Sequence, residues 1–275
     1  MPTLRVSTGV TLYYESHGDA DGTPVLFVRG TGADSSRWMH QVNEYVPSYR
    51  CLIFDNRGCG KSEAPEGPYT VPMMADDTLA LLDALDIERV HLSGLSLGGA
   101  IAQEMVLRSP QRVETLQLHG TWARTEGYAE LYFDMAARFL EVGGTDLYYE
   151  GTLLYLFPPD FFNEHPDRAG EILADMKSNS SPLAGLVSQI HANRTHDTLA
   201  RLGEVAVPTL ITVGELDMCL PPYFSRQLHE TIAGSELVVF PGGSHLFGIQ
   251  DPTTFNRVTL DWLAKHARRP RSDTD

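Results

Sequence analysis

Short apolar runs alternate with longer segments of helical composition along most of the chain. The apolar runs cover residues 24–28, 50–55, 89–94, 113–118, 208–214 and 236–240. An unbroken apolar run is typical of a strand that is buried on both faces of a parallel sheet. Segments of helical composition lie between or after these runs, at 38–45, 71–85, 97–108 and 223–232. The alternation predicts an α/β fold with a mostly parallel sheet, right-handed crossovers and flanking helices.

Two shorter segments at the beginning of the chain complete the predicted sheet. Residues 4–6 and 11–15 flank the Ser7-Thr8-Gly9 sequence, which is typical of a hairpin turn. The expected number of strands is therefore eight. A closing helix is predicted over 251–268.

The alternation breaks after the sixth strand. No further apolar run of the same kind occurs over 121–203, and helices are predicted at 126–140, 146–156, 166–178 and 182–192. Ten of the 22 Phe and Tyr residues of the chain lie in this segment. We interpret it as a helical lid on a core made of 1–120 and 204–270, followed by a frayed tail at 271–275. The aromatic residues predict a core within the lid, and a minority of them is expected to face a ligand.

Composition narrows the class of protein. The chain has 275 residues and a net charge of −15, which argues against nucleic acid and anionic membranes as partners. No apolar run has the length of a membrane span, the first residues do not resemble a secretory signal, and the three cysteines form no disulfide or zinc pattern. We expect a cytoplasmic protein with a small-molecule substrate, as a monomer or a homodimer. The acidic residues of the 71–85 helix are expected to form a solvated face: Asp76, Asp77, Asp83 and Asp86.

The sequence around Ser96 carries the clearest chemical signal. Gly94-Leu95-Ser96-Leu97-Gly98 stands between a predicted strand and a predicted helix. A serine in such a sharp turn has an exposed hydroxyl at a helix N-terminus, where backbone N–H groups favour negative charge. The flanking glycines are needed because side chains there would collide with the neighbouring strand and helix. Ser96 is therefore the candidate nucleophile.

An acid and a base follow two later strands. Asp217 comes after the strand that ends at Gly214, and His245 comes after the last strand. Functional groups in such sheets gather at the carboxyl ends of the strands, and the order Ser, Asp, His is typical of the nucleophile-elbow fold. His245 would take the proton of Ser96, and Asp217 would orient the imidazole. The backbone N–H groups of Thr31 and Leu97 would stabilise the oxyanion, so the chemistry needs no metal or organic cofactor.

Some alternatives stay open at this point. His119 also follows a strand and is a rival for the base or a pocket residue, and Glu215 is a rival for the acid. The Gly60-Lys61-Ser62 sequence is not a phosphate loop, because that loop would need a glycine where Asp55 stands. Candidate substrate contacts come from the loops that follow strands: Arg29, Gly30, Trp122, His119 and Phe247.

The chain resembles the α/β-hydrolase superfamily over nearly its whole length. The resemblance rests on the motifs 29–32, 55–62, 94–99, 214–217 and 243–245. Within the superfamily it is most similar to the 3-oxoadipate enol-lactonase and related small esterases and lactonases, through residues 68–70 and 98–103. The resemblance implies the fold and a serine hydrolase activity.

One residue departs from the family pattern. The family usually has His-Gly in the oxyanion loop, and this chain has Arg29-Gly30. Two interpretations follow: Arg29 orders the loop through hydrogen bonds, or its charge holds a substrate carboxylate or enolate.

The leading hypothesis is a serine hydrolase that cleaves an ester or lactone through an acyl-enzyme. The alternatives are a carbon–carbon bond hydrolase or specialised biosynthetic enzyme with the same triad, and a receptor that uses the lid as a ligand-operated switch.

Overall fold

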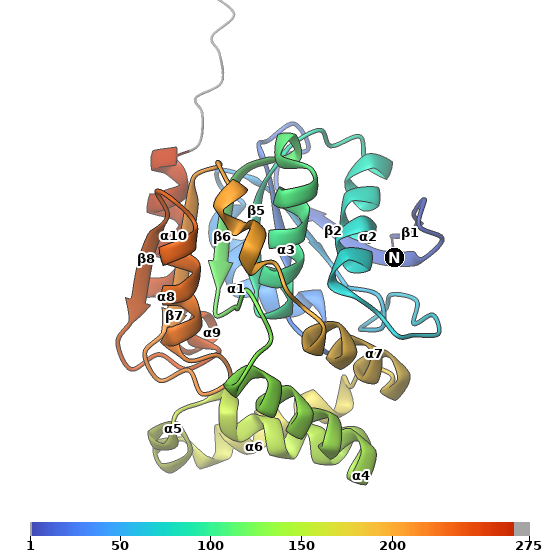
Figure 1. Ribbon diagram of the computed structural model, residues 1–275, viewed down its shortest axis with the longest axis vertical. Helices are drawn as coiled ribbons and strands as arrows, with labels where there is room; N and C mark the ends of the chain where they lie inside the picture. Colours follow the sequence, from blue (N-terminus) through green and yellow to red (C-terminus); the bar gives the residue numbers. More distant parts are fainter. Residues whose placement is uncertain (1, 267–275) are drawn as a thin grey trace, which may run out of the picture.

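Eight strands form one sheet in the computed structural model of the protein, which describes residues 2–266 (Figure 1). The strand order is β1-β2-β4-β3-β5-β6-β7-β8. The first two strands pair antiparallel with their neighbours, and the others are parallel. The strands are β1 (Thr3–Arg5), β2 (Thr11–His17), β3 (Pro24–Val28), β4 (Arg50–Phe54), β5 (Val90–Leu95), β6 (Val113–His119), β7 (Thr209–Gly214) and β8 (Glu236–Phe240). The predicted eight-stranded, mostly parallel sheet is confirmed.

Alternate residues of each strand face opposite layers of helices. In β3, Leu26 and Val28 pack in one apolar cluster, and Val25 and Phe27 pack in another. This alternation follows from the two-residue period of a strand, and it explains why the buried strands are continuously apolar. The first cluster holds α2 (Val71–Ala84), α3 (Leu97–Arg108) and α8 (Pro222–Thr231). The second holds α1 (Met39–Tyr45), α9 (Phe247–Gln250) and α10 (Pro252–His266).

Short 3₁₀ turns complete the connections between these elements. They are η1 (Ser35–Trp38), η2 (Pro110–Arg112) and η3 (Leu199–Glu204). The loop after β4 is held by Asp55, whose carboxylate accepts the backbone N–H groups of Ser35 and Lys61 at 2.7 and 2.8 Å. The Gly60-Lys61-Ser62 sequence is therefore part of a turn built around Asp55.

The prediction of a solvated acidic face on α2 is wrong for Asp77. Its side chain is buried and accepts two hydrogen bonds from the Arg57 guanidinium, one of them at 2.6 Å. Helical periodicity places Asp77 on the same face as the buried Met74 and Leu81, three residues before it and four after it. The pattern of charges along the helix did not show that the buried guanidinium of Arg57 packs against that face.

The insert after β6 is helical, as predicted. It contains α4 (Tyr128–Leu156), α5 (Pro159–Glu164), α6 (Pro166–Ser178) and α7 (Leu183–Arg194). In Figure 1, α4, α5 and α6 lie together at one end of the molecule. The two helices predicted over 126–140 and 146–156 are joined in α4, which is kinked at Gly144, where φ is 63°. The short α5 is not among the predicted helices.

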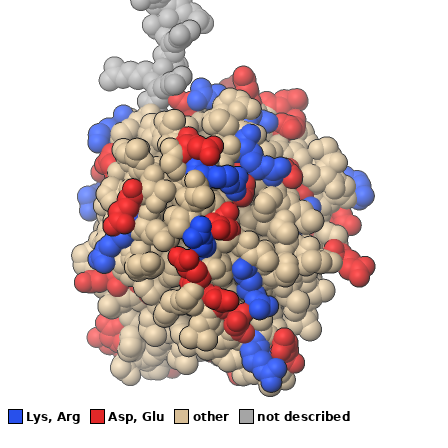
Figure 2. All heavy atoms as spheres, in the orientation of Figure 1, with Lys and Arg blue, Asp and Glu red and all other residues tan. Residues whose placement is uncertain are grey.

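Charged side chains of both signs are interspersed on the face shown in Figure 2. Within residues 2–266, no helix has the length and hydropathy needed to cross a membrane. The predicted frayed tail at 271–275, and the last residues of the predicted closing helix, lie outside the described residues.

Candidate active site

Ser96 stands in the sharp turn between β5 and α3. Its φ of 56° and ψ of −121° are a strained conformation for a residue with a side chain. A Cβ on Gly94 would lie 2.4 Å from the carbonyl oxygen of Gly98, and one on Gly98 would lie 2.1 Å from the carbonyl oxygen of Val28. The two glycines therefore allow the helix and the neighbouring strand to approach the turn, as the sequence predicts.

Two backbone N–H groups lie beside Ser96. Leu97 begins α3, and the loop after β3 packs against the serine, since a Cβ on Gly30 would lie 3.0 Å from the Ser96 Cβ. Within the described part of the chain, neither Thr31 nor Leu97 has a hydrogen-bond acceptor for its backbone N–H. Both donors are free for a negatively charged oxygen, as an oxyanion hole requires.

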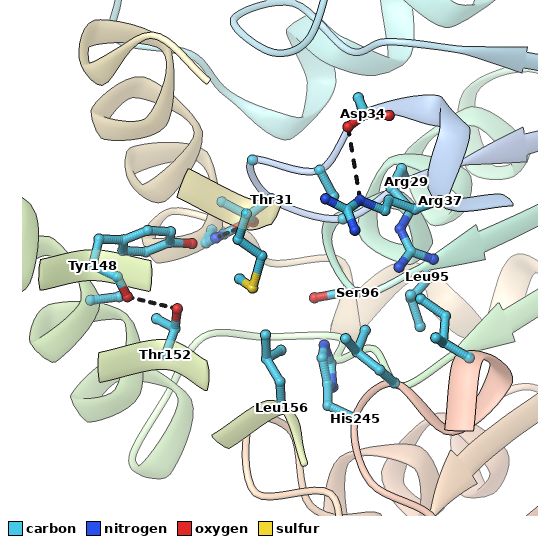
Figure 3. Close-up of a pocket in the computed structure, with 18 of the residues that line it drawn as sticks. Arg29, Thr31, Asp34, Arg37, Leu95, Ser96, Tyr148, Thr152, Leu156 and His245 are labelled. Carbon is cyan, nitrogen blue, oxygen red and sulfur yellow. Dashed lines mark hydrogen bonds and ion pairs between the residues drawn. The ribbon is translucent and has the colours of Figure 1, made fainter. Parts of the chain in front are cut away.

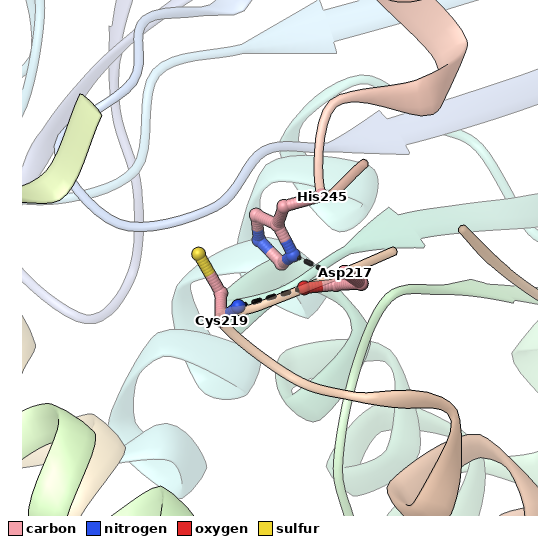
Figure 4. Close-up of side chains that lie close together, drawn as sticks. All are labelled: Asp217, Cys219 and His245. Carbon is pink, nitrogen blue, oxygen red and sulfur yellow. Dashed lines mark hydrogen bonds and ion pairs between the residues drawn. The ribbon is translucent and has the colours of Figure 1, made fainter. Parts of the chain in front are cut away.

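Asp217 and His245 are held together behind this turn (Figure 4). His245 Nδ1 lies 2.7 Å from Asp217 Oδ2, and both side chains are buried. The other carboxylate oxygen accepts the backbone N–H groups of Cys219 and Leu220, each at 2.9 Å. A neutral imidazole that donates its Nδ1 hydrogen to this anchored carboxylate would have Nε2 as its unprotonated nitrogen.

A cavity of about 150 Å³ joins Ser96 to His245 (Figure 3). Both side chains line it, together with Arg29, Gly30 and Thr31 from the loop after β3. No hydrogen bond joins Ser96 to His245 in this structure, and such a bond commonly tightens only in the substrate complex. The cavity is thus the place where a reacting carbonyl would meet the serine, the histidine and the two N–H donors.

The helical insert after β6 supplies much of the rest of the cavity lining. Of the ten Phe and Tyr residues of this segment, four line the cavity: Tyr132, Phe133, Tyr148 and Phe157. Others pack among themselves, as Phe161 does against Phe157 with the ring centroids 4.3 Å apart. Some aromatic residues of the insert therefore line the cavity, and others form a core within the insert.

Two lid residues that the sequence analysis missed hold the loop after β3. Asn193 Nδ2 donates to Thr31 Oγ1 at 2.8 Å, and Gln189 Oε1 accepts the Gly32 N–H at 2.8 Å. Both are buried residues of α7. No motif marks them, because their partners are more than 150 residues away in the chain.

The rival acid and base lie away from the cavity. His119 is fully buried between Ser93 Oγ and Thr212 Oγ1, at 3.0 and 2.7 Å. Burial lowers the pKa of its imidazole to about 3, with a further contribution from the charge of Arg29. Glu215 is exposed, and its carboxylate accepts the Gly242 N–H at 3.0 Å.

Two other candidate substrate contacts are packing residues in this structure. Trp122 is fully buried, and its Nε1 donates to Thr125 Oγ1 at 2.7 Å. Phe247 packs against Phe240 and Phe255 and lines a smaller neighbouring cavity, which Arg29 also borders. Neither lines the cavity that contains Ser96.

Cys219 lies next to the acid and the base (Figure 4). Its sulfur, an Asp217 oxygen and a His245 nitrogen all lie within 4.8 Å of one another, a spacing that a metal ion could bridge. However, the thiol contacts the Tyr132 hydroxyl and the Tyr155 carbonyl oxygen, both at 3.3 Å, and burial raises its pKa well above the usual value. All three side chains already have hydrogen-bond partners, which favours a structural role for the thiol over a ligand role.

Comparisons with known proteins agree with this architecture. A family model described as "alpha/beta hydrolase fold" matches residues 23–252. A protein of Azorhizobium caulinodans named "Putative carbamate hydrolase RutD" is 31% identical over 254 residues, covering 92% of this chain and 95% of that protein. The enol-lactonase from Burkholderia xenovorans LB400 has a TM-score of 0.88 and 29% identity, covering 96% of this chain and 100% of that one. A malate-bound thermophilic esterase from Thermogutta terrifontis has a TM-score of 0.87 and 28% identity, covering 97% of this chain and 100% of that one. The chain therefore belongs to the alpha/beta hydrolase family.

Proposed function

We propose that the protein is a serine hydrolase that cleaves a carboxylic ester or lactone of a small molecule, with Ser96 as nucleophile. The observation that carries this proposal is the arrangement around the cavity. Ser96 and His245 line the same space, and His245 is bonded through Nδ1 to an anchored carboxylate. That arrangement suits acyl transfer, because a serine hydroxyl needs an oriented base to attack a carbonyl carbon.

The first half of the reaction forms an acyl-enzyme. Ser96 Oγ attacks the carbonyl carbon while its proton passes to His245 Nε2. The imidazolium is stabilised by Asp217, which accepts the Nδ1 hydrogen. The oxyanion receives hydrogen bonds from the N–H groups of Thr31 and Leu97, and each such donor contributes about 3 kcal/mol. The carbon–oxygen bond to the leaving group then breaks, and the leaving alkoxide takes the proton from His245.

The second half repeats these steps with water. His245 removes a proton from water, the hydroxide attacks the acyl carbon, and the same two N–H groups stabilise the new oxyanion. Collapse releases the carboxylic acid and returns the proton to Ser96. In a lactone the leaving alkoxide stays attached to the acyl group, so a single hydroxy acid is released.

Carbamate hydrolysis is a second candidate on the same groups. It is favoured by relatives named "Putative carbamate hydrolase RutD", which are about 30% identical over nearly the whole chain. Attack of Ser96 on a carbamate ester would expel the alkoxide and form a carbamoyl-enzyme that water then cleaves. The nitrogen side would leave as an amine, which needs the proton of His245 even more than an alkoxide does. Carbon–carbon bond hydrolysis and a receptor role have no comparable observation in their favour.

The experiment combines labelling with turnover. Wild-type protein, Ser96→Ala and the matched control Ser244→Ala are treated with a fluorophosphonate probe and assayed with short-chain esters, lactones and a carbamate. Ser244 is a suitable control because it precedes His245, is buried, and its hydroxyl has no hydrogen-bond partner among the described residues.

We expect labelling and turnover in wild type and in Ser244→Ala, and the loss of both in Ser96→Ala. Activity should fall by about 10⁴-fold or more, as for other serine hydrolases that lose the nucleophile. Labelling that persists in Ser96→Ala contradicts the assignment of the nucleophile. Labelling of Ser96 without turnover of any ester, lactone or carbamate contradicts hydrolysis and favours a receptor.

A further inference from the structure

Arg29 is a buried cation that forms no ion pair with a carboxylate of the described residues, although the charge of Asp34 acts on it from a distance. It follows the last residue of β3, and only 4% of its surface is exposed. Among residues 2–266, no carboxylate pairs with its guanidinium, and its Nε has no hydrogen-bond partner. Its one specific contact is with the Trp38 ring, whose centroid lies 5.1 Å from the guanidinium carbon.

The side chain of Arg29 does not order the loop through hydrogen bonds. The loop is held instead by main-chain and lid contacts: Asn56 Nδ2 donates to the Arg29 carbonyl oxygen at 2.9 Å, and Asn193 and Gln189 bind Thr31 and Gly32. The first interpretation of the departure from His-Gly therefore finds no support in the contacts of the guanidinium.

The guanidinium borders the reaction cavity. Arg29 lines the same space as Ser96 and His245, and Figure 3 shows the three around it. Burial lowers the pKa of Arg29 to about 9, which leaves the group charged at neutral pH. An unpaired buried charge costs several kcal/mol, and an anion that enters the cavity would offset that cost.

The other charges that line the cavity compensate one another. Arg37 forms ion pairs with Asp34, at 3.9 Å, and with Asp175. Arg37, Asp34 and Asp175 together carry one net negative charge, so the four groups including Arg29 sum to zero, but Arg29 is the one among them that forms no ion pair within the described residues. The Asp217 carboxylate lies behind His245, and both of its oxygens accept hydrogen bonds. Arg29 is thus the cation of the lining that is left for a ligand.

We propose that the substrate is an ester or lactone that carries a carboxylate, and that Arg29 binds this carboxylate. The inference rests on the proposed serine hydrolase function. The guanidinium fork matches a planar carboxylate, and Gly30 and Thr31 follow directly, so binding of the anion would set the carbonyl beside Ser96 and the Thr31 N–H. The apolar walls contributed by Tyr132, Phe133 and Leu156 fit the carbon chain between the two groups.

The test uses two substrates that differ in one group. Monomethyl glutarate carries a carboxylate, and methyl glutaramate replaces it with a neutral amide of nearly the same shape. Wild-type protein is expected to prefer the acid in kcat/KM by about 10- to 100-fold, the usual effect of a hydrogen bond to a charged group. Arg29→Met should lose this preference, with the loss confined to the acid.

Two further variants separate local recognition from general charge. Arg50→Met removes one positive charge from β4 and should keep the preference, since Arg50 contacts Ser16 and Ala20 at the opposite end of the sheet. Arg29→Lys should recover only part of it, because an ammonium lacks the planar fork. Urea unfolding should show Arg29→Met to be at least as stable as wild type, since it removes an unpaired buried charge.

A binding measurement decides the question without turnover. Glutarate should raise the Tm of wild type and of Ser96→Ala, and should leave the Tm of Arg29→Met unchanged. Equal hydrolysis of the two esters by wild type, or equal stabilisation of wild type and Arg29→Met by glutarate, overturns the role of Arg29 and leaves the hydrolase function intact. Failure of Ser96 to react with the fluorophosphonate overturns the hydrolase function instead.

Discussion

The two sides of His245 differ in how their polar groups are satisfied. On the side of Asp217, each carboxylate oxygen accepts at least one hydrogen bond and the Nδ1 of the imidazole is paired. On the side of the cavity, the hydroxyl of Ser96 is not bonded to His245, and among the described residues the N–H groups of Thr31 and Leu97 have no acceptor and the guanidinium of Arg29 has no hydrogen-bonded or charged partner. On the Asp217 side, the protein itself satisfies the polar groups. On the cavity side, the polar groups are left to bind a ligand.

The two buried arginines of the core make the same contrast. Arg57 forms hydrogen bonds with the carboxylate of Asp77 on α2, so its charge has a structural role. Arg29 is equally buried and has only the face of Trp38. Burial alone therefore does not assign a charged residue to structure or to function, whereas the presence or absence of its partner does.

The largest expected effect is the loss of kcat on substitution of Asp217, the carboxylate that is paired with His245. Asp217→Asn should lower kcat by about 10⁴-fold, because an amide in place of the carboxylate favours the wrong imidazole tautomer. The nearby Glu215→Gln is the matched control and should change kcat by about threefold at most, since its carboxylate is exposed. Steady-state kinetics on the best ester found checks both. Equal losses in the two variants would contradict the assignment of Asp217.

The second effect is a loss of protein stability when the buried ion pair between Arg57 and Asp77 is broken. Asp77→Ala leaves Arg57 buried and unpaired, and should lower the free energy of unfolding by about 3–5 kcal/mol in urea. Asp76→Ala is the matched control, because it removes an exposed ion pair with Arg108 from the neighbouring position. It should lower the free energy of unfolding by about 1 kcal/mol or less. The double variant Arg57→Met/Asp77→Leu should recover most of the loss. Similar costs for Asp77→Ala and Asp76→Ala would show that the buried pair has no special role.

The smallest effect per residue concerns the pH dependence of stability. Burial lowers the pKa of His91 and His196 to about 4 and that of His119 to about 3, from a usual value of 6.5. Between these values the unfolded chain binds more protons than the folded one, so stability falls as pH decreases below about 6.5. Each histidine should cost about 2 kcal/mol between pH 7 and pH 5.

The contribution of one histidine can be isolated by substitution. The variant His119→Gln should show a shallower loss of unfolding free energy between pH 7 and pH 5 than wild type, measured by urea unfolding at several pH values. An unchanged slope would mean that His119 does not titrate differently in the folded and unfolded states.

The sequence by itself determined the order of the eight strands and of the longer helices along the chain, the position of the insert after the sixth strand and the strained turn at Ser96. These features depend on local or periodic properties of the chain. Continuous apolar runs form buried strands, and Gly94 and Gly98 are the residues that allow a close turn. Asp217 and His245 were also singled out in the sequence, because parallel strands bring their carboxyl ends to one edge of the sheet, and the structure places the two side chains 2.7 Å apart.

The tertiary structure decided which polar groups have partners. In the sequence, Asp77 is one of four acidic residues in or next to a predicted helix, and only the structure shows that it pairs with Arg57. Likewise, only the structure shows that Asn193 and Gln189 bind the loop at 31–32. The same holds for Arg29, whose lack of an ion pair depends on every residue folded around it. Hydrogen bonds and ion pairs act over a few ångströms between residues that lie far apart along the chain, so only the folded protein shows which of them are formed.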